Sequence, residues 1–183
     1  CALPICDPGR AGIVREIIDA GHYVGAHSDR HLLYCDWEDR DSTLVSREEF
    51  REDLRNNYRE LRRFGVKMEK ARLFLPPFEW YNREIVNWSR ELGLEVVNFT
   101  PGTGTNADYT SPGMENYRSS EEILAGLESF ARNSGSGLNG AILLIHPGTP
   151  EERVDKLYQR LGGLIDSYLD RGYRFGSLDL AEE

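Results

Sequence analysis

Apolar residues recur at helical spacing along much of the chain, and local signals mark where these stretches begin or end. Residues 11–20 repeat isoleucine and valine at helical spacing, and a glycine follows as a helix stop. Ser46 with Glu49, and Ser119 with Glu122, have the spacing of a capping box. We therefore predict helices over 11–20, 46–63 and 80–92, from Ser119 onward, and over 150–171, the last interrupted or kinked near Gly162 and Gly163.

Short apolar runs lie between the expected helices and predict strands. Residues 141–145 are apolar without alternation, as expected of a strand that is buried on both faces. The alternation of strand with helix predicts an α/β domain with a mostly parallel sheet, either open or closed into a barrel. A stretch rich in Gly, Thr, Asn and Pro over 100–112 predicts a long loop. Strands are expected at 23–26, 72–75, 94–99, 141–145 and 173–178.

Three histidines follow expected strands. His27 and His31 come just after residues 23–26, and His146 comes just after residues 141–145. Because the carboxyl ends of parallel strands gather at one edge, we expect these histidines to lie together there. In a helical turn, residues i and i+4 share a face with β-carbons roughly 5–6 Å apart, which suits two imidazoles on one ion. The spacing predicts a site for a divalent metal, with zinc first.

Two points stay open at this site. Two histidines on a surface loop can also lie four residues apart by chance, without holding a metal. Zinc usually takes a third protein ligand and keeps a position for water, and nearby the sequence offers only Asp29, Asp36 and Asp39. His22 has another interpretation, because it follows a glycine at a helix end, where an imidazole can meet the last carbonyls.

The composition narrows the classes of partner. A formal net charge of −9 and the lack of a basic run argue against nucleic acid or an anionic membrane as the main partner. A neutral carbohydrate is compatible with that charge. No apolar stretch is long enough for a transmembrane helix. The cysteines Cys1, Cys6 and Cys35 lack paired spacing, which disfavours a cysteine zinc site or a disulfide framework.

The residues around the histidines resemble the polysaccharide deacetylase family with NodB homology, carbohydrate esterase family four. Residues 21–31 (GHYVGAHSDRH) are similar to the family's second motif, H-[ST]-x-x-H, including its glycine-rich lead-in. Residues 143–146 (LLIH) resemble its final histidine motif. Pro76-Pro77-Phe78 stands where the family has R-x-P-[YFW]. The resemblance covers nearly the whole chain.

The resemblance implies a deformed (β/α) barrel and a metal-dependent hydrolase that removes N- or O-linked acetyl groups from a carbohydrate. By position, His27 and His31 would hold a divalent metal, most often zinc, and His146 would be the general acid that protonates the leaving group. The backbone N–H after Pro77 would stabilise the oxyanion. The residues expected to bind the sugar are Pro77, Phe78, Glu79, Trp80, Asn98 and Phe99.

The chain also departs from the family pattern. The Asp-Asp pair of the first motif, which supplies the catalytic base and the third metal ligand, is absent, and by family layout it belongs upstream of residue 11. Leu75 stands in the place of the third motif's arginine, and Glu79 replaces a usual small residue. For the acidic-tryptophan motif, Asn98-Phe99 and Asp108-Tyr109 are the nearest candidates.

We therefore expect a single deacetylase-like domain over 6–183 that lacks the first β-α-β portion of the barrel. Such a chain should bind zinc weakly and show little deacetylation. The segment Cys1–Ile5 resembles the translation of a common sequencing adapter, so we expect residues 1–5 to be non-native.

Two alternative functions stay open beside the deacetylase. One is a catalytically inactive, carbohydrate-binding relative without the aspartate base. The other is a different zinc hydrolase on a similar barrel, with Asp29, Asp36 or Asp108 as a carboxylate near His27. The compartment also stays open, although the resemblance is compatible with export or a place in the cell envelope.

Overall fold

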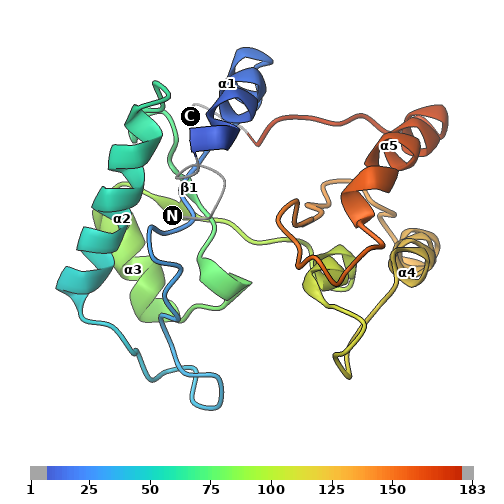
Figure 1. Ribbon diagram of the computed structural model, residues 1–183. Coiled ribbons are helices and arrows are strands. Elements are labelled where there is room, and N and C mark those ends of the chain that lie inside the picture. The colour runs from blue at the N-terminus through green and yellow to red at the C-terminus, as the bar shows by residue number, and fades with distance from the viewer. Residues whose placement is uncertain (1–7, 179–183) are drawn as a thin grey trace. The chain divides into compact units, whose positions relative to one another are not determined.

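The computed structural model describes residues 8–178, which divide into two compact units. The first unit reaches to Asn98 and includes Ser177, and the second is Phe99–Gly176 (Figure 1). Each unit has a hydrophobic cluster of its own. The segment 1–5 that we expect to be non-native lies outside the described residues.

Parallel pairing organises the first unit. Strand β1 (Leu73–Phe74) pairs in parallel with β2 (Glu95–Val96), so that Phe74 is opposite Val96. On its other side, Phe74 forms a parallel bridge with Ala26. The chain just before the histidine turn therefore lies beside β1. The helices and short 3-10 helices of this unit are η1 (Pro8–Arg10), α1 (Ala11–Asp19), α2 (Arg47–Arg62), η2 (Pro77–Glu79) and α3 (Arg83–Glu91).

Helix α2 joins the histidine turn to the core of the first unit. It begins at the predicted capping box, in which the Ser46 hydroxyl accepts from the Glu49 N–H and the Glu49 carboxylate accepts from the Ser46 N–H. Its Phe50, Leu54 and Leu61 are fully buried, at the spacing of one helical face. Burying a leucine side chain contributes roughly 1.5–3 kcal/mol, which fixes this polar helix against β1.

The second unit contains helices joined by long irregular segments. Its elements are η3 (Thr105–Tyr109), α4 (Ser120–Asn133), η4 (Leu157–Arg160) and α5 (Leu161–Asp170). The capping box of Ser119 and Glu122 is present at the start of α4, as predicted. Arg153 is fully buried, and one of its guanidinium nitrogens donates to the carbonyls of Thr110 and Arg118. Through these two bonds Arg153 joins two irregular segments of the chain.

Three predicted strands are wrong. No strand is assigned within 141–145 or 173–178, and 23–26 contributes only the bridge at Ala26. Residues 141–145 are half-buried rather than buried on both faces. Their contact with Thr100 consists of one backbone hydrogen bond and one bond to its hydroxyl, which does not make a ladder. The described residues thus form a two-stranded parallel sheet, and the barrel stays a prediction.

Two predicted helices begin later than expected. The helix predicted over 80–92 starts at Arg83, because the Asn82 side chain caps it by accepting from the Ile85 N–H. The helix predicted over 150–171 is preceded by turns and η4, and α5 then runs through both glycines near 162 without a break. The interruption lies just before these glycines, where η4 ends and α5 begins at Leu161, and there is no kink at the glycines themselves. Within residues 8–178, no helix has both the length and the apolar character needed to cross a bilayer.

Alkaline pH should destabilise the first unit through its buried tyrosines. Burial raises the pKa of Tyr58 above its ordinary value near 10, and its hydroxyl donates to the Ala71 carbonyl. The folded protein therefore holds this proton more tightly than the unfolded chain. The stabilisation is complete below about pH 10 and falls as the pH rises further, by up to about 1.4 kcal/mol per pH unit for one group.

Urea unfolding measured from about pH 8 to about pH 11 tests this expectation. Tyr58→Phe removes the titrating hydroxyl and should make the alkaline loss of unfolding free energy shallower. An equally steep loss in Tyr58→Phe would contradict this role for Tyr58.

Candidate functional site

The structure brings the two motif histidines together. The ring centroids of His27 and His31 are 5.1 Å apart, with the rings inclined at 66°. The expected helical turn is wrong, however, because Ser28 and His31 have φ angles of 83° and 54°. Left-handed backbone at these positions, rather than helical periodicity, makes the rings neighbours.

A single buried carboxylate holds this turn. Asp53 of α2 is fully buried and accepts from the Ser28 hydroxyl at 2.5 Å and from the Tyr34 hydroxyl at 2.8 Å. It also accepts from the Arg30 backbone N–H at 2.9 Å, and the Arg30 guanidinium lies 3.6 Å away. The Ser28 hydroxyl in turn accepts from the His31 N–H at 2.9 Å. The turn between the histidines is thus fixed to α2.

The hydrogen bond from Tyr34 to Asp53 also affects the pKa of Tyr34. Burial raises it well above its ordinary value, and the negative charge of Asp53 raises it further. Tyr34 therefore stays protonated and keeps donating to Asp53 throughout the physiological pH range.

The ring of His27 has a defined orientation. Its Nδ1 donates to the Leu75 carbonyl at 2.7 Å, and its backbone N–H donates to the Asn57 side-chain oxygen at 3.1 Å. A carbonyl can only accept, so Nδ1 carries the proton and the lone pair of the neutral ring is on Nε2. Histidines that bind metals usually have such a partner on the other nitrogen. Leu75 thus contacts the site through its backbone, although it stands where the family has an arginine.

Phe78 is placed beside the histidine pair. Its ring lies edge-on to that of His31, with centroids 4.6 Å apart. Phe78 and Glu79 have φ angles of 59° and 54° inside η2. The Glu79 carbonyl accepts from the Asn98 side chain at 3.0 Å, and Pro77, the first residue of η2, is buried. Three of the residues predicted to bind sugar therefore lie in one bend, with Trp80 following it.

Trp37 was not predicted for the site. Its ring stacks on Trp80 at 5.6 Å and meets Phe78 edge-on, also at 5.6 Å. Trp37 lies in the run C-D-W-E-D-R-D, residues 35–41. A large aromatic residue within a charged segment was the signal that could have found it.

His146 has a carboxylate partner within the second unit. Its Nδ1 donates to one oxygen of Asp108 at 2.6 Å, and its backbone N–H donates to the other at 2.7 Å. Asp108 is fully buried, and the Tyr109 ring lies edge-on to the imidazole at 6.1 Å. Of the two candidates for the acidic-tryptophan motif, Asp108-Tyr109 is thus the one that contacts His146. Phe99, which also belongs to this unit, is half-buried.

The expected meeting of His146 with His27 and His31 stays a prediction, because they belong to different units. Residues 8–178 contain no group of three or more His, Cys, Asp or Glu side chains arranged to hold a metal. Asp36 accepts from the backbone N–H groups of Glu38 and Asp39, and these bonds lower its pKa. Its carboxylate therefore has a role in the local turn.

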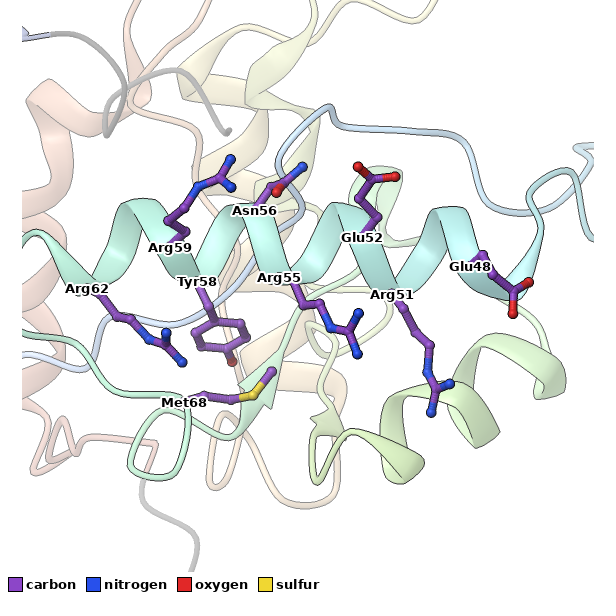
Figure 2. A pocket seen from close by; sticks show the side chains of 9 residues that line it. All are labelled: Glu48, Arg51, Glu52, Arg55, Asn56, Tyr58, Arg59, Arg62 and Met68. Atoms are coloured by element: carbon purple, nitrogen blue, oxygen red, sulfur yellow. The ribbon is translucent and has the colours of Figure 1, made fainter.

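A cavity of about 770 Å³ lies along α2 (Figure 2). Asp53 and Asn57, which hold the turn, are not among its lining residues. The cavity is lined by Glu48, Arg51, Glu52, Arg55, Asn56, Tyr58, Arg59, Arg62 and Met68. Its walls are mostly charged, unlike the aromatic surface beside His31.

Residues 9–97 match the polysaccharide deacetylase family. No curated protein matches the chain. Among solved structures, the CE4 family pseudoenzyme BA3943 from Bacillus anthracis is 22% identical with a TM-score of 0.61, over 90% of this chain and 47% of that one. A BA3943 mutant with restored enzymatic activity is 21% identical with a TM-score of 0.61, over 90% and 49%.

The Bc1960 peptidoglycan N-acetylglucosamine deacetylase is 20% identical with a TM-score of 0.65, over 92% of this chain and 66% of that one. The chain therefore spans about half of the BA3943 structures and 66% of Bc1960. At these identities the likeness shows a shared fold.

Removing the Asp53 carboxylate should release the histidine turn. Asp53→Ala leaves two hydroxyls and one N–H without their acceptor. We expect the free energy of unfolding to fall by about 3 kcal/mol or more. Glu52→Ala is the matched control, because Glu52 is the exposed neighbour on the same helix and should change stability by less than about 0.5 kcal/mol. Urea denaturation measures both. Equal stabilities of the two variants would contradict the role of Asp53.

Proposed function

We propose that the polysaccharide deacetylase (NodB) domain of this chain, which the family match and the fold neighbours support, is a metal-dependent hydrolase that removes acetyl groups from a carbohydrate. The observation that carries the proposal is the His27–His31 pair, with rings 5.1 Å apart and His27 Nδ1 bonded to a carbonyl. The proposal covers acetyl groups on nitrogen and on oxygen alike, and it names no particular sugar.

His27 and His31 would hold a divalent metal, zinc first. Neutral imidazole is a good ligand for zinc, and the Nδ1 bond of His27 directs its Nε2 lone pair toward that role. When bound, such a metal polarises the acetyl carbonyl and lowers the pKa of a bound water. The Asp53 network would keep the two rings in place during this chemistry, so that little reorganisation is needed.

His146 would act as the general acid. With Nδ1–H held by the buried Asp108, Nε2 is the nitrogen that can carry a proton to the leaving amine or alkoxide. The Asp108 charge favours the protonated imidazole and keeps the ring in one orientation. The proposal therefore includes Asp108 as a positioning residue.

The sugar would lie against the bend that contains Phe78 and Trp80. Both rings belong to the aromatic cluster beside His31, where the metal is proposed. We also propose that Pro77, Glu79, Asn98 and Phe99 contact the sugar. The proposed cofactor is zinc. The proposed location is outside the cell or in the cell envelope.

A second candidate is an inactive relative that binds carbohydrate without hydrolysing it. Leu75 stands in the place where the family pattern has an arginine. BA3943, which shares the fold, is itself described as a pseudoenzyme. Acetate release separates the two candidates, since only the deacetylase produces it.

The two kinds of histidine should differ when substituted. In a protein that also supplies the third metal ligand and the base, His27→Ala should abolish zinc binding and with it acetate release. His146→Ala should keep zinc and lower turnover by roughly 10²–10⁴-fold, since a general acid contributes about that much. Zinc titration and acetate release from N- and O-acetylated oligosaccharides give the two readouts.

His22→Ala is the matched control, because His22 is exposed beyond the end of α1 and should change neither readout. Loss of zinc from His146→Ala would show that its role is assigned wrongly. Unchanged zinc affinity in His27→Ala would refute the metal site.

Asp108→Asn should slow turnover and leave zinc bound. The amide keeps the size of the side chain but lacks the charge that favours protonated His146, and we expect a loss of roughly 10–100-fold. The apparent pKa of the alkaline limb of the pH–rate profile, where a general acid loses its proton, should fall, because His146 loses its proton more easily. Asp170→Asn, at an exposed position of α5 in the same unit, is the control. A profile that does not shift would contradict the positioning role.

A further inference from the structure

The segment 35–43, here the Trp37 loop, is internally built. A bridge pairs Cys35 with Thr43 in antiparallel orientation, and the Asp36 N–H donates to the Ser42 carbonyl at 2.9 Å. The Asp36 carboxylate accepts from two N–H groups at the tip of the loop, at 2.8 and 2.9 Å. The backbone on both sides of Trp37 therefore has fixed partners.

The loop is also fastened to the bend after β1. The Trp80 ring N–H donates to the Asp36 carbonyl at 2.9 Å, and the Arg40 Nε donates to the Tyr81 carbonyl at 2.7 Å. The Arg40 guanidinium lies over the Trp80 ring, 4.2 Å from its centroid. These contacts join residues about forty positions apart, so the loop has a defined place beside the aromatic bend.

This bracing holds an aromatic surface open to solvent. Trp37 is 55% exposed and Phe78 is 43% exposed, although both touch other rings. The Arg40 guanidinium already lies over the Trp80 ring. Shielding Trp80 is therefore not by itself a reason for a tryptophan at position 37. A large aromatic side chain kept exposed on a braced loop is typical of a binding surface, because little conformational entropy is lost when a ligand stacks on it.

The positions of the rings give an order along the surface. The His31 ring meets Phe78 at 4.6 Å, and Phe78 meets Trp37 at 5.6 Å. Trp37 is therefore separated from the histidine pair by one aromatic ring. A sugar held at the histidines would contact Phe78, and its neighbour in an oligosaccharide would reach Trp37.

The charge of the loop selects among sugars. Beside Trp37, the exposed residues Glu38, Asp39 and Asp41 carry negative charge against the single positive charge of Arg40. Carboxylates at this density disfavour an anionic ligand and accept a neutral or cationic one.

We propose that Trp37 binds substrate by stacking on the sugar ring next to the one whose acetyl group is removed, and so selects neutral oligosaccharides over single sugars. This inference rests on the proposed function. The C–H face of a pyranose carries weak positive charge and fits the negative face of the indole ring.

The test measures sugar binding by calorimetry on the full chain, with the monosaccharide N-acetylglucosamine and its β-1,4-linked tetrasaccharide as probes. Trp37→Ala should weaken binding of the tetrasaccharide about tenfold and leave the monosaccharide unchanged. Trp37→Phe keeps an aromatic face and should restore most of the affinity. Leu44→Ala is the matched control, because Leu44 is a 50% exposed apolar residue directly after the loop.

Circular dichroism and the unfolding midpoint show whether each variant is folded. If Trp37→Ala is not folded, the Trp37→Phe variant keeps the test valid. Wild-type affinity for the tetrasaccharide in Trp37→Ala, or equal weakening of both probes, would overturn the inference and leave the proposed function standing. If the unaltered chain binds neither probe, the proposed function fails for this class of sugar, and the inference fails with it.

Discussion

The buried carboxylate of Asp53 is the constraint on which the candidate metal site depends. A charge at a fully buried position is costly unless donors surround it, and here two hydroxyls and a backbone N–H do so. The apolar face of α2 fixes where this carboxylate lies. Because the same helix carries both the apolar face and Asp53, the packing of the core and the geometry of the histidine turn are parts of one arrangement.

The two units use the same device on their histidines. In the first unit the Leu75 carbonyl accepts from Nδ1 of His27, and in the second the Asp108 carboxylate accepts from Nδ1 of His146. In each ring this bond fixes the proton on Nδ1 and the orientation of the imidazole. The acceptors differ in charge, and this matches the proposed roles. A neutral carbonyl suits a ligand that must stay neutral, whereas a carboxylate suits an imidazole that must carry a proton.

Local chemistry could be predicted from the sequence, and long-range contacts could not. The capping boxes at Ser46 and Ser119 depend on residues three positions apart, and both are present. Residues 141–145 have the composition of a buried strand, but a strand also needs a neighbour to pair with. The pairing of His27 with His31 was predicted for the wrong reason, since it depends on Ser28 and Asp53 rather than on a helical turn. Trp37 was missed because its position depends on contacts with residues far along the chain, such as Trp80 and Tyr81.

The conformation of Ser28 limits which residues can replace it. With φ at 83°, the backbone there favours glycine, but glycine has no hydroxyl to give Asp53 its proton and His31 its acceptor. Threonine has the hydroxyl, but its branched β-carbon is crowded in a left-handed conformation. Alanine has the same backbone freedom as serine but no hydroxyl. Of the twenty residues, serine alone combines a hydroxyl at this distance with a tolerable backbone, so mutational tolerance at position 28 should be lower than at either histidine's exposed neighbours.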